Sequence, residues 1–153
     1  MKETVVILDN IRSVHNVGSL FRTCEGAGVS KLYLCGVTPA PKDRFGRDRS
    51  DLAKVALGTE NLVPWEEVTD TKTCITKLKS EGYMIIAIEQ DARSKDFKTF
   101  TPKEKTAFVF GEETKGLTKE LLDMCDEILE IPMRGEKESL NVSVSAGIIL
   151  FNK

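Results

Sequence analysis

The first cluster of residues that could carry chemistry runs from Asn10 to Cys24 and reads NIRSVHNVGSLFRTC. On a helix, His15, Ser19 and Arg22 would share one face, because residues three and four apart are neighbours there. Arginine presents a planar fork of donors that matches phosphate, so this face could clamp a phosphate group. Each residue also has a plainer interpretation, with Asn16 as a helix N-cap and Arg22 as a solvated surface arginine.

The second cluster, residues 108–117, reads FVFGEETKGL and places an apolar run before a turn with glycine at both ends. Glycine lets a backbone approach a ligand closely. The sequence contains neither the G-x-G-x-x-G pattern of dinucleotide sites nor the P-loop pattern, so neither of those sites is indicated. An ordinary turn with surface carboxylates is the alternative.

The third cluster joins IPMRG at residues 131–135 to SLNVSVS at residues 139–145. Polar and apolar residues alternate strictly from Ser139 to Ser145, and this pattern by itself predicts an edge strand. A helix would instead place its apolar side chains on one buried stripe. That stripe would consist of Leu140, Val144, Gly147, Ile148 and Phe151.

Strands and helices must position these clusters. The apolar runs predict five strands, at residues 4–8, 31–35, 84–88, 106–110 and 127–131. Four helices are predicted. One lies around residues 17–24 and is ended by Gly26 and Gly28, a short one lies near 52–57, and a third spans 71–80 and is closed by Gly82. The fourth follows an N-cap at Thr118 and carries Leu121, Leu122 and Cys125. Such alternation predicts an α/β fold with a mainly parallel sheet flanked by helices, in one domain over residues 1–153. The first cluster lies where α/β proteins bind ligands, outside the carboxyl end of a strand.

Composition restricts the function further. The chain has 153 residues, 41% hydrophobic and 30% charged, and a net charge of −2, which fits a soluble globular protein and disfavours a strongly basic nucleic-acid binder. A local basic stretch can still contact phosphate. The polar loop 38–51 offers one, although Asp43 and Asp48 dilute its charge and a solvated loop is an equal alternative. Its basic residues, interleaved with Phe45, are Lys42, Arg44, Arg47 and Arg49.

The four cysteines form no C-x-x-C pair and the chain has a single histidine, so a structural metal site is not expected. No signal peptide and no apolar run of membrane-spanning length is present. These features predict a cytoplasmic protein that has reduced thiols and no membrane partner.

In this order, the three clusters resemble the three motifs of the TrmH/SpoU family within the SPOUT methyltransferases. His15-Asn16-Val17-Gly18 through Arg22-Thr23 resembles motif 1, and Phe110-Gly111-Glu112-Glu113 to Gly116-Leu117 resembles motif 2. Ile131-Pro132-Met133 followed by 139–144 resembles motif 3. The similarity extends from about Thr4 to Phe151. The sequence departs from the family pattern at Glu112, which adds a negative charge beside the implied cofactor site.

The resemblance implies an S-adenosyl-L-methionine-dependent RNA methyltransferase that modifies a ribose 2′-hydroxyl of tRNA or rRNA. It also implies a C-terminal trefoil knot, and a final helix, in place of the strand, that forms a homodimer. The implied catalytic residues are Asn16, Arg22, Glu113, Ser139 and Asn141. The implied cofactor-binding residues are Phe110, Gly111, Glu112, Gly116, Ile131, Met133, Ser139, Leu140 and Asn141. Candidate RNA contacts are His15, Arg44, Arg47, Arg49, Lys115 and Arg134.

Two rival functions remain open at this point. One is a non-catalytic RNA-binding protein that keeps the fold, and loss of Arg22 or Asn141 would have favoured it, yet both are present. The other is an α/β enzyme that acts on a small nucleotide without RNA. Binding of S-adenosylmethionine without any RNA binding would favour that second rival.

Overall fold

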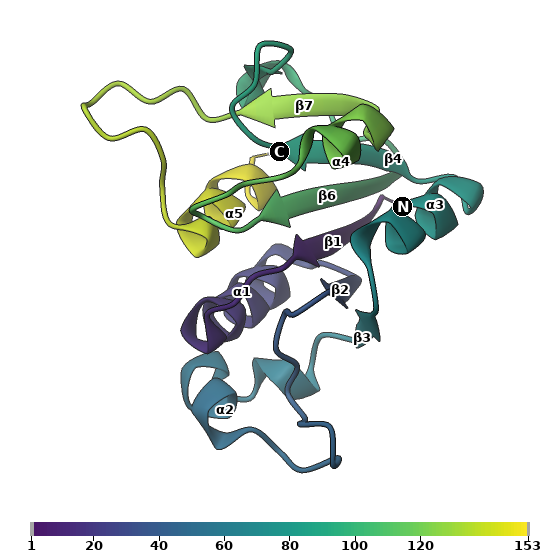
Figure 1. The fold of residues 1–153 in the computed structure, drawn as a ribbon, viewed down its shortest axis with the longest axis vertical. Helices are drawn as coiled ribbons and strands as arrows, with labels where there is room; N and C mark the ends of the chain where they lie inside the picture. Colours follow the sequence, from purple (N-terminus) through teal and green to yellow (C-terminus); the bar gives the residue numbers. More distant parts are fainter. Residues whose placement is uncertain (1, 153) are drawn as a thin grey trace.

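The computed structural model describes residues 2–152, which form a seven-stranded parallel sheet with helices on both faces (Figure 1). The strand order across the sheet is β3-β2-β1-β6-β4-β7-β5, and every neighbouring pair is parallel. The predicted α/β fold with a mainly parallel sheet is confirmed. The strands are β1 (Glu3–Asp9), β2 (Lys31–Cys35), β3 (Trp65–Val68), β4 (Met84–Ile88), β5 (Lys95–Asp96), β6 (Lys105–Gly111) and β7 (Glu127–Glu130).

The five strands predicted from apolar runs are all present, with boundaries that differ by at most one residue. Ile131, predicted to close the last strand, lies just beyond β7. Two strands were missed. β3 reads WEEV and β5 reads KD, so neither has the apolar run that marks a buried strand. Both lie at the edges of the sheet, where one side of the strand needs no partner.

Burial on both faces explains why the central strands read as unbroken apolar runs. In β1, Val6 and Leu8 point into one hydrophobic core, and Val5 and Ile7 point into the other. The first core holds side chains of α1 (Val14–Ala27), α2 (Ser50–Ala56) and α5 (Val142–Leu150). The second holds side chains of α3 (Thr71–Ser80) and α4 (Lys119–Met124). Two short 3₁₀ turns, η1 (Thr59–Asn61) and η2 (Phe97–Thr99), complete the chain's regular elements within residues 2–152.

Ser13 is the N-cap of helix α1, and its hydroxyl accepts a hydrogen bond from the Asn16 backbone N–H at 3.1 Å. The suggestion that Asn16 is the N-cap is therefore wrong, and its side chain is free for other contacts. The helix ends at Gly28 in the left-handed conformation, as predicted, but it runs through Gly26, which was also expected to end it. Gly18 lets α1 approach α2 closely, because a Cβ there would lie 2.8 Å from Val55 Cβ.

The other predicted helices are also present. α3 spans the predicted residues, and Thr118 caps α4 by accepting a hydrogen bond from the Leu121 N–H. Cys125 was predicted to lie on this helix, but it is the residue at which the helix has ended. None of the helices between residues 2 and 152 has the length and apolar character that crossing a bilayer requires.

The strand predicted for residues 139–145 by alternation alone is wrong, and the helix implied by the family resemblance is confirmed from Val142 onward. The buried side of α5 also differs from the predicted stripe. Its buried residues are Val142, Ala146, Ile149 and Leu150. From the predicted stripe, Val144 and Phe151 remain 50% and 57% exposed. Apolar residues lie on nearly every side of α5. One side packs against the sheet, and the side that carries Val144 stays uncovered.

The C-terminal trefoil knot that the family resemblance implies stays a prediction.

Candidate active site

The three motif segments meet at the carboxyl ends of β1, β6 and β7. In Figure 1 these strands point toward the side of the molecule that carries α5 and the long loop leading into it. α1 follows β1, the loop 112–117 follows β6, and the loop 131–141 links β7 to α5. Since all strands run in the same direction, residues that follow each of them gather at one edge of the sheet.

A hydrogen-bonded triad, Asn16–Glu113–Asn141, joins one residue from each motif. Asn16 Nδ2 donates to Glu113 Oε1 at 2.7 Å, and Asn141 Nδ2 donates to Asn16 Oδ1 at 3.1 Å. These partners are 97 and 125 residues apart in the sequence. Asn141 also caps α5, because its Oδ1 accepts from the Ser143 N–H at 2.9 Å. The triad therefore links the start of α1 to the start of α5 through the motif 2 loop.

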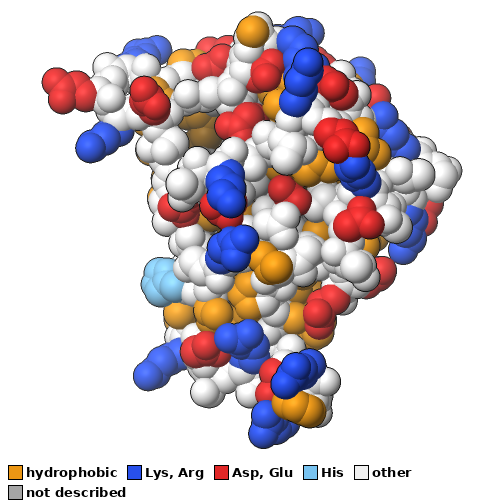
Figure 2. Space-filling view, in the orientation of Figure 1, with side chains coloured by type: hydrophobic (Ala, Val, Ile, Leu, Met, Phe, Trp, Pro, Cys, Tyr) orange, Lys and Arg blue, Asp and Glu red, His pale blue; other side chains and the backbone are white. Residues whose placement is uncertain are grey.

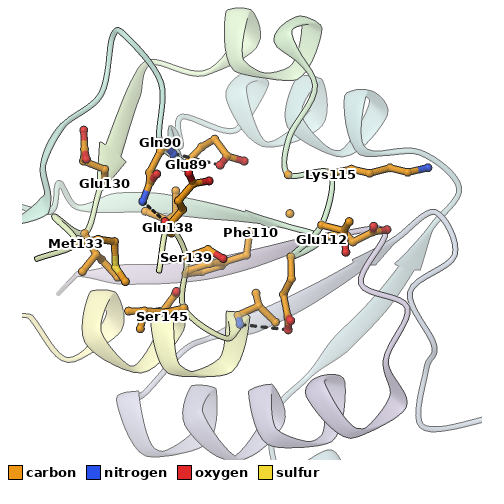
Figure 3. Close-up of a pocket in the computed structure, with 18 residues that line it drawn as sticks. Glu89, Gln90, Phe110, Glu112, Lys115, Glu130, Met133, Glu138, Ser139 and Ser145 are labelled. Atoms are coloured by element: carbon orange, nitrogen blue, oxygen red, sulfur yellow. Dashed lines mark hydrogen bonds between the residues drawn. The ribbon is translucent and has the colours of Figure 1, made fainter. Parts of the chain in front are cut away.

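A cavity of about 320 Å³ lies beside the triad, with side chains from β4, β6, β7 and α5 around it (Figure 3). That volume is at the lower end of the range for small-molecule sites. Eight of the nine residues expected to bind the cofactor line it, and Asn141 does not. Ser139 and Phe110 lie near its centre in Figure 3, and Met133 lies at one side. The eight lining residues are Phe110, Gly111, Glu112, Gly116, Ile131, Met133, Ser139 and Leu140.

The motif 2 turn is held closed by Glu89, a residue at the end of β4. Glu89 Oε2 accepts a hydrogen bond from the Leu117 N–H at 2.8 Å. Gly116 has φ of 65°, and a Cβ at this position would collide with the same carboxylate. The Gly116 N–H also donates to the Glu112 carbonyl at 2.8 Å. Glycine is therefore required here, both for the left-handed conformation and for the close approach of Glu89.

The cavity is strongly acidic. Five carboxylates and one lysine line it, and Lys115 extends away from the other labelled side chains in Figure 3. The carboxylates are Glu89, Glu112, Glu113, Glu130 and Glu138. Glu112 forms an ion pair with the exposed Arg12, with Nε and Oε2 3.2 Å apart. Such a lining favours a ligand that carries positive charge.

A second cavity of about 200 Å³ adjoins the first. Arg12 and Asn16 line only the second cavity, while Glu113 belongs to the shared wall. The residues that line both cavities are Glu112, Glu113, Thr114 and Val142. Groups bound in the two cavities would meet at these shared residues, and Glu113 is the one member of the triad among them.

A buried carboxyl group, Asp9, lies beneath this edge of the sheet. Asp9 ends β1 opposite Gly111 of β6 and accepts a hydrogen bond from the Thr71 hydroxyl. Burial raises the pKa of Asp9, the bond from Thr71 opposes that rise, and the negative charge of Glu112 adds to it. Because the group is buried, it supports the site from below rather than contacting a ligand.

Other residues expected at the site lie outside the triad and both cavities. Arg22 is exposed on α1, six residues after Asn16, which is about 9 Å along the helix axis. His15 is exposed near the start of the same helix. Arg134 lies exposed in the loop before α5, and Arg44, Arg47 and Arg49 lie in the loop before α2.

The structure also adds residues that sequence reasoning missed. Glu89, Gln90 and Glu130 line the first cavity, and Gln90 Nε2 donates to the Glu138 carbonyl at 2.5 Å (Figure 3). Each of the three missed residues stands at or just after the carboxyl end of β4 or β7. The rule that ligands bind at this edge could have found them, had it been applied to every predicted strand.

Comparison with known proteins is decisive for the family. The model of the SpoU rRNA Methylase family matches residues 3–151. The chain belongs to this family. A "Putative TrmH family tRNA/rRNA methyltransferase" of Staphylococcus haemolyticus is 34% identical over 148 residues, which cover 97% of this chain and 57% of that protein. The "23S rRNA (guanosine-2'-O-)-methyltransferase RlmB" of Neisseria meningitidis serogroup B is 35% identical over 95% of this chain and 56% of its own length.

Two solved structures agree with the fold. An rRNA methyltransferase from Sinorhizobium meliloti, solved with AdoMet bound, superposes with a TM-score of 0.88 at 28% identity, covering 98% of this chain and 55% of that chain. A TrmH/SpoU tRNA modifying enzyme of A. aeolicus gives 0.85 at 29% identity, over 99% of this chain and 74% of that one. This SpoU-family chain spans little more than half the length of the curated relatives it matches.

Proposed function

We propose that the protein transfers the methyl group of S-adenosylmethionine to a ribose 2′-hydroxyl of tRNA or rRNA. The observation that carries the proposal is the triad Asn16–Glu113–Asn141, whose Glu113 lines both of two adjoining cavities. Methyl transfer needs a donor and an acceptor held in line at close range, which two cavities that meet at shared residues can provide. We further propose that residues 1–153 act as one cytoplasmic methyltransferase domain.

The residues of the larger cavity fit the cofactor. Its volume suits a small molecule, and apolar side chains such as Phe110, Ile131 and Leu140 can cover the adenine ring. Its carboxylates complement a cofactor that carries a sulfonium and an ammonium group. When bound, S-adenosylmethionine supplies an electrophilic methyl group. Backbone groups of the loops 111–116 and 131–140 would hold it in place.

The triad would orient the acceptor ribose. Glu113 Oε1 accepts from Asn16 Nδ2 and, at 3.4 Å each, from Asn141 Nδ2 and the Val142 N–H. Within the described residues, Glu113 Oε2 accepts no hydrogen bond, so it remains able to accept one from the 2′-hydroxyl. A carboxylate in that position favours loss of the hydroxyl proton as the oxygen attacks the methyl carbon. Ser139, on the cavity side, would add a further hydrogen-bonding group.

Arginine side chains would bind the RNA backbone. Arg22 would contact the phosphate next to the methylated ribose, because its guanidinium matches phosphate geometry. Additional RNA contacts are proposed for the basic residues that lie outside the triad. They are His15, Arg44, Arg47, Arg49, Lys115 and Arg134.

A homodimer is proposed through the uncovered side of α5. Val144 and Phe151 are half exposed there, and Phe151 lies beside Gly26 of α1, so the apolar surface continues onto that helix. A second copy would remove these side chains from water. Val144→Glu would place a charge in the interface and should convert a dimer into a 17.0 kDa monomer in sedimentation at micromolar concentration. A wild-type chain that sediments only as the monomer would refute the proposal.

The function is tested by methyl transfer from labelled S-adenosylmethionine to total tRNA and to rRNA in separate reactions. The expected product is a 2′-O-methylated nucleoside in one of the two RNAs. Calorimetry should show cofactor binding with competition by S-adenosylhomocysteine. Cofactor binding undetectable with or without RNA would contradict the proposal. RNA binding without methyl transfer would support a non-catalytic RNA-binding protein instead.

A further inference from the structure

The loop between β2 and α2 carries a phenylalanine at its tip that the proposed chemistry does not use. The side chain of Phe45 is 67% exposed, although burying an aromatic ring is normally favourable. Basic side chains surround it. Figure 2 shows this grouping at the lower end of the molecule, where Lys and Arg side chains flank an exposed hydrophobic one.

The loop holds Phe45 in a defined position. Asp43 Oδ1 accepts hydrogen bonds from the backbone N–H groups of Phe45 at 2.8 Å and Arg47 at 3.0 Å. The Gly46 N–H donates to the Asp43 carbonyl at 2.9 Å, and the Asp43 N–H donates to the Arg47 carbonyl at 2.8 Å. The ring is therefore presented by a closed turn, which reduces the entropy lost when a partner binds.

Two guanidinium groups lie over the ring. The Cζ atoms of Arg44 and Arg47 are 4.9 Å and 5.1 Å from its centroid, within the range of cation–π attraction. They differ in freedom. Arg47 Nε is anchored to Asp43 Oδ2 at 3.0 Å, whereas within residues 2–152 no carboxylate forms an ion pair with Arg44. Arg44 can thus move off the ring toward a phosphate while Arg47 stays in place.

We propose that Phe45, with Arg44 and Arg47, is a stacking platform for an unpaired base of the RNA substrate. The base would stack against the ring, and Arg44 would bind the adjoining phosphate. This inference rests on the proposed function for the identity of the RNA as substrate. Proteins commonly hold single-stranded nucleic acid with aromatic rings on which bases stack, accompanied by basic side chains.

Charge and position favour RNA over another protein. Four basic and two acidic side chains lie between residues 42 and 49, in a chain whose net charge is −2. A protein-docking surface would be expected to have a wider apolar centre than one ring among charges. The loop also leaves β2 at its carboxyl end, and parallel strands place that end at the same sheet edge as the triad. An RNA bound at the triad can therefore continue toward Phe45.

The test measures binding of the full chain to a single-stranded RNA of about 15 nucleotides, a length that covers one such site. A duplex of the same length is measured in parallel. Phe45→Leu keeps an apolar side chain without a π face and should weaken single-strand binding about tenfold. Duplex binding by Phe45→Leu should change less than twofold. Phe45→Trp, which keeps a π face, should bind single-stranded RNA with the wild-type affinity. Leu62→Ala is the matched control, because Leu62 is 66% exposed on a different surface segment, and it should bind as wild type.

Salt dependence separates stacking from phosphate contact. Arg44→Gln should lower the slope of log K against log salt by about 0.7, the value for one phosphate of a single strand. Phe45→Leu should leave the slope unchanged. The platform is refuted by Phe45→Leu binding single-stranded RNA as wild type does, or by Trp and Leu showing the same loss.

RNA affinity and its salt dependence are measured without cofactor. A failure of the platform proposal can therefore be distinguished from a failure of the methyltransferase proposal. Phe45→Leu should also keep wild-type affinity for S-adenosylmethionine, which shows that its cavity is intact. A wild-type chain that binds single-stranded RNA through Phe45 but never binds the cofactor would contradict the proposed function and still support the platform.

Discussion

The triad region and the Phe45 loop are built in opposite ways. The triad joins residues 97 and 125 positions apart, on three elements around an acidic cavity. The Phe45 loop is basic, and the hydrogen bonds that hold its tip connect residues that lie within four positions of one another. A site that must align two reactants needs the rigidity of packed elements, whereas a surface that accepts a flexible strand needs only a locally ordered turn. Substitutions should therefore act on rate in the first region and on RNA affinity in the second.

The largest effect is expected from Glu113→Gln, which keeps the shape of the triad and removes its charge. If Glu113 accepts the hydroxyl proton, single-turnover methyl transfer should fall about 10³-fold. The melting temperature should stay close to that of wild type. Glu104→Gln, an exposed position just before β6, is the matched control and should transfer at the normal rate. A Glu113→Gln enzyme of near-normal rate would remove the carboxylate from the mechanism.

Arg22→Lys tests whether the catalytic region extends along α1 beyond the triad. Lysine keeps the charge but loses the planar fork, so phosphate alignment should fail and transfer should slow about 10²-fold. The variant should remain a dimer and bind S-adenosylmethionine normally, because neither cavity includes Arg22. If its single-turnover rate is instead near normal, Arg22 is not the central catalytic residue. His15 then becomes the next candidate for that role, and the same rate is measured for His15→Gln.

Asp43→Ala should open the Phe45 loop without touching the triad. The loop would then have to be ordered on binding, so single-stranded RNA should bind about threefold more weakly. The rate of methyl transfer at saturating RNA should match that of wild type, because the triad region sets this rate. A large loss of rate at saturating RNA would show that the two regions are not separate.

The smallest effect concerns stability beneath the triad. Because the pKa of Asp9 is raised, mainly by burial, the folded state binds its proton more tightly than the unfolded state. Its contribution to stability is full below the ordinary Asp pKa of about 3.9 and is lost as pH rises through the folded pKa. Asp9→Asn lacks this loss, and its amide oxygen can still accept from Thr71. The difference in melting temperature between Asp9→Asn and wild type should therefore increase from pH 4 to pH 7. The increase should be about 2–4 °C for each kcal/mol of stability that wild type loses as Asp9 ionises. A constant difference across this range would contradict the account.

The sequence by itself determined the elements that are strongly patterned. The run VVIL of β1 could only be buried, and the caps at Thr118 and Gly28 fixed ends of α4 and α1 through local hydrogen bonds and backbone freedom. The ordered motif residues identified the family, and eight of the nine expected cofactor residues do line one cavity. The strand and the caps are readable because each depends on neighbours a few positions away, whereas the cofactor residues were implied by the family resemblance.

Only the tertiary structure decided the rest. Residues 139–145 alternate like a strand, yet α5 forms from Val142 because one of its sides packs against the sheet and α1, which no local pattern records. Edge strands β3 and β5 lack apolar runs and exist through pairing with β2 and β7. The contact of Asn16 with Glu113 and Asn141, and the closure of the motif 2 turn by Glu89, depend on strand order. Strand order brings distant residues to one edge of the sheet, and that information resides in the packing of the whole chain.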